Sequence, residues 1–428
     1  MTTLLKQVLK GQVYPAMGCT EPVSVALCAA NASALHKGRI KKAVVFVDSA
    51  TFKNGLGVRI PNTDGEKGNL LAAALGLLTA KPKLGMEILK GVSSSVLKKA
   101  KILLEEKAVT IKVKNQKGFY IKTEVLFEDG YKTKAVISGC HTAVTYLEDN
   151  GRVLIDVKPE VKTGKSEGDF KRLLAKASLS DLVREAQNAD DEDLAYIKEG
   201  ALMNLAAAKK GANLKKVGFY LSELVKLGML DKNLINSAKI LASQAADARM
   251  DGIAVPVMSS GESGNQGIVA VLVPYHVGKR LKIKEKTILQ SIALSHLLNG
   301  YVKAFTGDLA PICGCAIAAG VGASAAIVYQ QKGVDLKAIT LAVNNIISDI
   351  GGMLCDGAKS GCALKVVSSV DSALRAAFMG MNHYGITEVE GFIGKTAEAT
   401  IQNLSRISTV GMVKVDTTIV DIMKSKTK

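Results

Sequence analysis

The spacing of apolar residues changes once along this chain, and that change sets the fold class. Residues 109–157 hold five short runs of alternating or β-branched apolar residues, joined by Gly-containing turns. Such runs are typical of strands in a mostly antiparallel sheet. From residue 170 onward, apolar residues recur at helical spacing almost throughout. We therefore expect an α+β protein, with a mixed domain over residues 1–165 and a mainly helical domain over residues 170–428.

The pattern also gives the expected elements. The helix expected at residues 20–37 has clear limits, because Thr20 can cap it, Pro22 suits its first turn and Gly38 can end it. The charged segment 158–169 is the best candidate for a domain boundary. The expected strands cover residues 40–47, 109–113, 120–127, 132–138, 143–148 and 153–157. The expected helices cover residues 20–37, 69–78, 92–106, 181–188, 191–209, 214–227, 232–247, 285–303, 313–331, 336–350, 363–379 and 398–407.

The composition is that of a globular protein and gives no support to nucleic-acid binding. The chain has 428 residues, of which 48% are hydrophobic and 22% are charged, as in ordinary folded proteins. Its net charge is +17, but aromatic residues make up only 4% of it. The basic residues are scattered and are not interleaved with aromatic side chains on which bases could stack. We expect no nucleic-acid partner.

The cysteine pattern indicates a reducing compartment. Seven cysteines are widely spaced in a large chain, unlike the disulfide frameworks of small secreted proteins. The N-terminal ten residues suggest a short amphipathic helix and lack the apolar core of a signal peptide. A cytoplasmic location is therefore expected.

One uncharged stretch, residues 309–331, is long enough to span a bilayer. It contains Pro311, three glycines and two cysteines, and it lacks the aromatic belts of membrane helices. A buried central helix is the preferred interpretation, with no membrane partner. A membrane-associated protein built around this stretch is the alternative.

Three cysteines lie in Gly- and Ala-rich sequence near the C-terminus, namely Cys313, Cys355 and Cys362. Thiolates hold iron–sulfur clusters, and small residues let the backbone approach a bulky group. Three thiolates on a four-iron cube would leave one iron open as a Lewis acid. The two glycines between Cys355 and Cys362 favour a loop between helices. Their spacing matches neither zinc nor ferredoxin motifs, so buried free cysteines are the alternative.

Two further segments could bind an anion. Residues 259–267 are rich in Ser and Gly and precede an apolar run, so backbone N–H groups at a helix start could receive a carboxylate or phosphate. Lys53 and Asn54 precede Gly55 and Gly57, which together suggest a cation on a permissive loop. The alternatives are an ordinary tight turn and a solvated turn.

Two isolated residues are candidates for proton transfer. Cys19 precedes a helix N-terminus, where the helix dipole would lower the pKa of its thiol. It could be a base, a fourth cluster ligand or part of a plain capping segment. His141, one of five histidines, is expected at the end of a strand, and it could be structural or catalytic.

Five motifs occur in order along nearly the whole chain. They are Met17-Gly-Cys-Thr-Glu-Pro22, Lys53-Asn-Gly55, Ser260-Gly-Glu-Ser-Gly-Asn-Gln-Gly267, Leu309-Ala-Pro-Ile-Cys313 and Gly352-Met-Leu-Cys-Asp-Gly-Ala-Lys-Ser-Gly-Cys-Ala-Leu-Lys365. Together they resemble the L-cysteine desulfidases, relatives of the iron–sulfur L-serine dehydratase alpha chain. The resemblance implies an oxygen-sensitive [4Fe-4S] cluster and no pyridoxal phosphate.

The resemblance also implies roles for individual residues. Cys313, Cys355 and Cys362 would be the cluster ligands, with Cys315 as a rival to Cys313. The base would be Cys19 or, as second choice, His141. The substrate carboxylate would bind to Ser260, Gly261, Ser263, Gly264, Asn265 and Gln266, helped by Lys53 and Asn54.

The expected reaction is β-elimination of L-cysteine to hydrogen sulfide, pyruvate and ammonia. L-Serine dehydration at the same cluster is one alternative, and a non-catalytic iron–sulfur or metal-binding protein is another. The expected partner is a small amino acid, and a homo-oligomer is left open.

Overall fold

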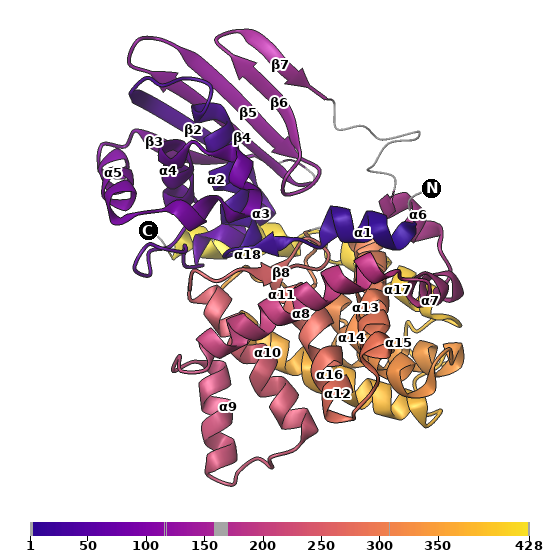
Figure 1. The fold of residues 1–428 in the computed structure, drawn as a ribbon. Coiled ribbons are helices and arrows are strands. Elements are labelled where there is room, and N and C mark those ends of the chain that lie inside the picture. Colours follow the sequence, from indigo (N-terminus) through magenta and orange to yellow (C-terminus); the bar gives the residue numbers. More distant parts are fainter. Residues whose placement is uncertain (1–2, 115, 117, 158–169, 308, 427–428) are drawn as a thin grey trace.

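The computed structural model describes residues 3–114, 116, 118–157, 170–307 and 309–426. Within them the chain is α+β, as expected. A sheet with its helices forms one region and a body of helices forms the other (Figure 1). The expected domain boundary, residues 158–169, lies outside the described residues.

The main sheet has six strands in the order β3-β2-β4-β5-β6-β7. Only the β2–β3 pair is parallel, and the other four pairs are antiparallel, which confirms the expected mostly antiparallel sheet. Each strand starts and ends within one residue of its expected limit. The strands are β2 (Ile40–Asp48), β3 (Val109–Lys114), β4 (Tyr120–Phe127), β5 (Lys132–Ser138), β6 (Val144–Asp149) and β7 (Arg152–Asp156).

Helices cover one face of this sheet. Buried and half-buried residues alternate along β4, because successive side chains of a strand point to opposite faces. Helix α2 (Thr20–Ser33) packs on the buried face and against α4 (Asn69–Thr79). A Cβ at Gly76 of α4 would lie 2.1 Å from the carbonyl oxygen of Ala26, so this crossing depends on glycine. The 3₁₀ segment η1 (Pro82–Gly91) and α5 (Ser94–Glu105) complete the layer.

The helical region is built around α13 (Glu285–Thr306) and α14 (Ala318–Lys332). Every residue of α14 from Ala318 to Gln330 is buried, as expected for a central helix.

None of the helices in the described residues is long and apolar enough to cross a membrane. The other helices here are α6 (Phe170–Lys176), α7 (Leu179–Gln187), α8 (Asp191–Gly211), α9 (Val217–Lys226), α10 (Leu234–Met250), α11 (Gly264–Gly267), the π-helical η3 (Ile268–Leu272), α12 (Val273–Arg280), α15 (Leu336–Ile350), α16 (Cys362–Met381), α17 (Ala397–Arg406) and η4 (Ile407–Gly411).

Several elements join the two regions. Strand β1 (Pro15–Ala16) pairs antiparallel with β8 (Val257–Met258). Helix α1 (Leu4–Gln12) packs against α13 of the helical region. Helix α18 (Val415–Ser425), near the C-terminus, packs under α3 (Ser49–Leu56) of the sheet region (Figure 1).

Three local predictions were wrong. Residues 53–57 were expected in a loop, but Lys53 and Asn54 lie in α3, because the Asp48 carboxylate caps that helix by accepting from the N–H groups of Ala50 and Thr51. The N-cap of α2 is Cys19, not Thr20, and the helix ends at Ser33. Helix α14 begins at Ala318, so residues 313–317 form a turn.

Candidate active site

A cavity lies where the two regions meet. It is lined by α2 and α3 from the sheet region, and by α13, the loop before α11 and two cysteine-bearing segments from the helical region. The residues that carry chemistry there are Cys19, Glu21, Lys53, Asn54, His141, Arg249, Glu262, Ser263, Asn265, Gln266, Lys303, Cys313, Cys315, Cys355, Cys362 and Lys365.

Backbone pairing brings the cysteine segments together. Ile312 and Leu354 form an isolated antiparallel bridge. Beside it, the Cys313 N–H donates to the carbonyl of Met353 at 2.8 Å, and the Cys355 N–H donates to that of Pro311 at 2.7 Å. Cys355 lies in the loop before α16, whose first residue is Cys362, as the two intervening glycines predicted.

Four cysteines of these segments line the same cavity, and none of them is in a disulfide. They are Cys313, Cys315, Cys355 and Cys362. A hydrogen bond from Cys315 and the charge of Lys365 lower the pKa of Cys313 to about 6, against the effect of burial. Burial raises the pKa of Cys362 to about 11.

Cys19 lies next to this group. It belongs to a small buried cluster with Val58, Met250 and Cys362. Its Sγ donates to Glu21 Oε2 at 2.9 Å. Burial raises the pKa of Cys19 well above its ordinary value, and the charge of Glu21 adds to this, whereas Arg249 opposes it. The helix dipole was expected to lower this pKa, but burial and the neighbouring carboxylate outweigh it.

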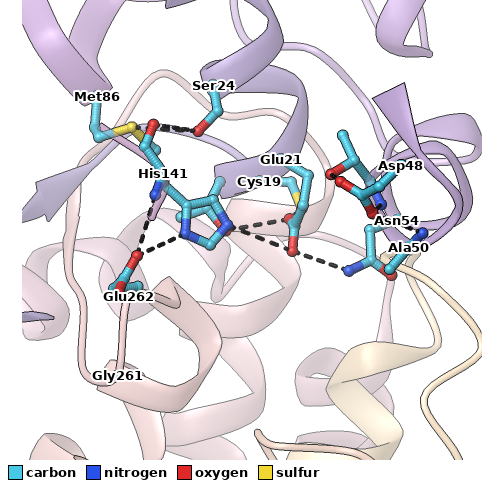
Figure 2. Close-up of polar contacts among 12 residues, drawn as sticks. Cys19, Glu21, Ser24, Asp48, Ala50, Asn54, Met86, His141, Gly261 and Glu262 are labelled. Atoms are coloured by element: carbon cyan, nitrogen blue, oxygen red, sulfur yellow. Dashed lines mark hydrogen bonds and ion pairs between the residues drawn. The ribbon is translucent and has the colours of Figure 1, made fainter. Parts of the chain in front are cut away.

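His141 is held between two carboxylates, from Glu21 and Glu262 (Figure 2). Its Nδ1 lies 3.0 Å from Glu262 Oε2, and its Nε2 lies 3.9 Å from Glu21 Oε1, an ion-pair distance. Burial alone would lower the pKa of His141, but the two carboxylates raise it to about 9. Burial opposes ionisation of Glu21 and Glu262 too, yet contacts with His141 hold both pKa values below their usual range. The imidazole is therefore positively charged at neutral pH.

The Ser/Gly-rich segment forms a loop before α11, as expected, but only part of it faces the cavity. Ser263, Asn265 and Gln266 line it, and Ser260 and Gly261 do not. The Ser260 hydroxyl instead receives a hydrogen bond of 2.8 Å from Asn299 Nδ2 and lies 2.8 Å from His296 Nδ1. The Gly261 carbonyl accepts from Lys303 Nζ at 2.7 Å.

Lys53 also lines the cavity, but its amine is engaged by protein groups. Its Nζ donates to the Cys355 carbonyl at 2.7 Å and pairs with Asp416 Oδ1 of α18 at 2.6 Å. Asn54 donates from Nδ2 to Glu21 Oε1 at 2.9 Å, while its Oδ1 has no hydrogen-bond partner within the described part of the chain. Lys53 thus holds the cysteine loop, and Asn54 keeps an acceptor free.

Sequence comparison identifies the family of this chain. The family model described as "Serine dehydratase alpha chain" matches residues 83–421. The chain belongs to the serine dehydratase alpha-chain family. This family supports a lyase-type enzyme of amino-acid breakdown, similar to serine dehydratase.

Similar proteins match nearly the whole length of this chain. A UPF0597 protein of Elusimicrobium minutum is 66% identical, with 99% of this chain and 100% of the relative covered. Another from Geobacter sulfurreducens is 51% identical, with 99% of each chain covered. A third, from Clostridium tetani, is 40% identical, with 98% of each covered. No solved structure matches.

The donor set of the cavity suits an iron–sulfur cluster in its chemistry, because such clusters are held by thiolates. Within the described ranges, no three His, Cys, Asp or Glu side chains are close enough to hold one metal ion. The cavity offers four thiols, and Lys53, Lys303 and Lys365 also line it, which suits an anionic cluster.

Sequence reasoning missed three acidic or basic groups. Glu21 and Glu262 both lie inside the motifs given above. Two features of the sequence could have identified them: a carboxylate two residues after Cys19, and a carboxylate within the Ser/Gly-rich segment 259–267. Arg249 gave no signal, because a basic residue in the last turn of a helix is ordinary. The structure buries it in the cavity wall at 2% exposure.

Proposed function

We propose that this protein is an iron–sulfur-dependent L-cysteine desulfidase, which eliminates hydrogen sulfide from L-cysteine and leaves pyruvate and ammonia. The observation that carries the proposal is the sharing of one cavity by the four thiols and the Cys19–Glu21–His141 group. A store or sensor of iron needs no acid–base group, so this combination favours an enzyme.

Cys355, Cys362 and Cys313 are the proposed cluster ligands, and Cys315 is the alternative to Cys313. The two compete because they lie in one turn and interact with each other. A cluster bound there would supply a Lewis-acidic iron for the departing sulfur. Lys53 and Lys365 position the loop, since their amines donate to the carbonyls of Cys355 and Leu354.

The chain's own groups move the proton. Elimination breaks the Cα–H and Cβ–S bonds of cysteine and forms a double bond; the product, 2-aminoacrylate, then takes up water to give pyruvate and ammonia. We assign proton abstraction to the thiolate form of Cys19 rather than to His141, because a charged imidazole has no free lone pair to accept a proton. Burial and the charge of Glu21 oppose this thiolate form of Cys19, whereas the charge of Arg249 favours it.

The same site could dehydrate L-serine, and the family description supports that second candidate. The two differ in the leaving group: a thiolate is softer than hydroxide and suits iron in a sulfur-rich site. The test is kcat/KM for both amino acids on one anaerobically reconstituted preparation without pyridoxal phosphate, because that ratio measures discrimination. A preference for L-cysteine is expected. A preference for L-serine would assign the dehydratase, and activity that requires pyridoxal phosphate would reject the cluster-based mechanism.

A further inference from the structure

Arg249 is a buried cation that has no acidic partner among the described residues. It lies in the last turn of α10, is 2% exposed and lines the cavity. Its Nε and Nη2 find no hydrogen-bond partner among the residues described. A guanidinium stays charged at all ordinary pH values, and an uncompensated buried charge is strongly destabilising. Such an arrangement suits a bound anion.

The cavity wall also carries unpartnered acceptors. Asn54 Oδ1, Asn265 Oδ1 and Gln266 Oε1 are buried and have no hydrogen-bond donor in the described structure. The orientation of the Asn54 amide is determined, because its Nδ2 donates to Glu21. Buried polar groups are almost always satisfied. One cavity thus has open donors on Arg249 and open acceptors on amides.

Gly264 makes room for this arginine. A Cβ at position 264 would lie 2.3 Å from Arg249 Nε and 2.7 Å from Val257 Cγ2. No residue with a side chain fits there without moving the guanidinium. This explains the glycine in a loop that was expected to contact the substrate directly.

We propose that Arg249 binds the carboxylate of an α-amino-acid substrate, and that the amide oxygens of Asn54 and Asn265 accept hydrogen bonds from its ammonium group. Nε and Nη2 face a carboxylate as a two-pronged donor, the geometry in which Arg binds carboxylates best. A phosphate or dicarboxylate would leave the amide acceptors unsatisfied. The inference rests on the proposed function, since it identifies the substrate class of that same site.

Other cations of the cavity are less suited to this role. Lys53 is paired with Asp416 and the Cys355 carbonyl. Lys303 donates to the Gly261 carbonyl, which holds the loop before α11 in place. Arg249 is also close enough to Cys19 for its charge to act on the thiol. A carboxylate on Arg249 would therefore bring the Cα hydrogen near the proposed base.

The test measures binding of L-alanine, which has the amino-acid head group but no leaving group. Calorimetry and thermal melting are run on the full chain after anaerobic reconstitution. L-Alanine should raise the melting temperature of the wild type, as any ligand of the folded state does. Arg249→Met should weaken its binding by roughly 10- to 100-fold, as expected for a lost charged hydrogen-bonded pair, and Arg249→Lys should fall between. L-Alaninamide, which lacks the carboxylate, should bind both proteins equally weakly.

A second readout separates binding from folding. Ligand-free Arg249→Met should melt no lower than the wild type, because the variant removes an unpaired buried charge. Arg375→Met is the matched control, since that arginine is half exposed and pairs with Asp349 and Asp371; it should bind L-alanine normally. Asn265→Ala should weaken L-alanine binding but not that of propionate, which has no ammonium group.

Wild-type affinity for L-alanine in Arg249→Met, no binding to the wild type, or a marked loss of stability in the ligand-free variant would each overturn the proposal. Failure of the proposed function gives a different result: L-alanine binds through Arg249, but no sulfide is released from L-cysteine.

Discussion

His141 Nδ1 lies 3.0 Å from Glu262 Oε2, and this contact joins the two regions of the molecule inside the cavity. His141 comes from the connection between β5 and β6, whereas Glu262 comes from the loop before α11. The backbone N–H of His141 donates to the same carboxylate oxygen at 3.2 Å. The acid–base group therefore depends on the docking of the sheet region on the helical region.

The pKa of His141 predicts how stability depends on pH. Its folded-state value of about 9 is above the ordinary 6.5. The charged form therefore stabilises the fold fully below pH 6.5, and this contribution is lost as the pH rises through 9. The shift corresponds to about 3 kcal/mol. We expect the melting temperature to fall between pH 7 and 10 in the wild type and to change much less in His141→Gln.

The control for this prediction is His383→Asn. His383 is exposed and has a φ of 55°, a conformation that Asn tolerates. This variant should keep the wild-type pH profile. Equal profiles for the wild type and His141→Gln would show that the imidazole is not charged in the folded state.

Cys355→Ala and Cys362→Ala should each lose most bound iron after anaerobic reconstitution. The wild type should hold about four irons per chain, as a thiolate-bound cube requires. Iron and sulfide analysis measures this. Cys28→Ala is the control, because Cys28 is buried beside β4 and β5 and does not line the cavity. Full iron retention in Cys355→Ala would reject the assignment. Cys313→Ala and Cys315→Ala are compared to identify the third ligand, which is the cysteine whose replacement removes the iron.

Cys19→Ser should keep the visible absorbance of the cluster and lose at least about 100-fold in turnover, the usual range for a missing proton acceptor. Serine fits the same space but is far less acidic than a thiol. The assay follows pyruvate and sulfide from L-cysteine. Normal turnover in this variant would remove Cys19 from the mechanism, and loss of absorbance would make it a ligand.

Gly76→Ala should destabilise the sheet region by at least about 2 kcal/mol, because overpacking forces backbone shifts. Its Cβ would lie 2.1 Å from the Ala26 carbonyl oxygen, on the neighbouring helix. Gly91→Ala is the matched control, since its Cβ would meet nothing within 4 Å. Urea unfolding compares the two, and equal midpoints would contradict the close crossing of α2 and α4.

The sequence predicted what short-range patterns determine. Alternation and Gly-containing turns located the strands of the main sheet, and the glycines between Cys355 and Cys362 correctly predicted a loop. Helix starts were less predictable, because capping by Asp48 overrode the glycines after Asn54. Arg249 could not be predicted, since its importance comes from having no partner among the described residues, and that is a property of the packed chain.

The contacts of Lys53 set an order of events in synthesis. Its amine reaches the Cys355 carbonyl and Asp416, which lie 302 and 363 residues farther along the chain. A ribosome must therefore add 302 residues after Lys53 before the first of these partners exists, and contacts this distant in sequence form slowly. The cavity wall is therefore completed only after both the sheet region and the helical region have been synthesised.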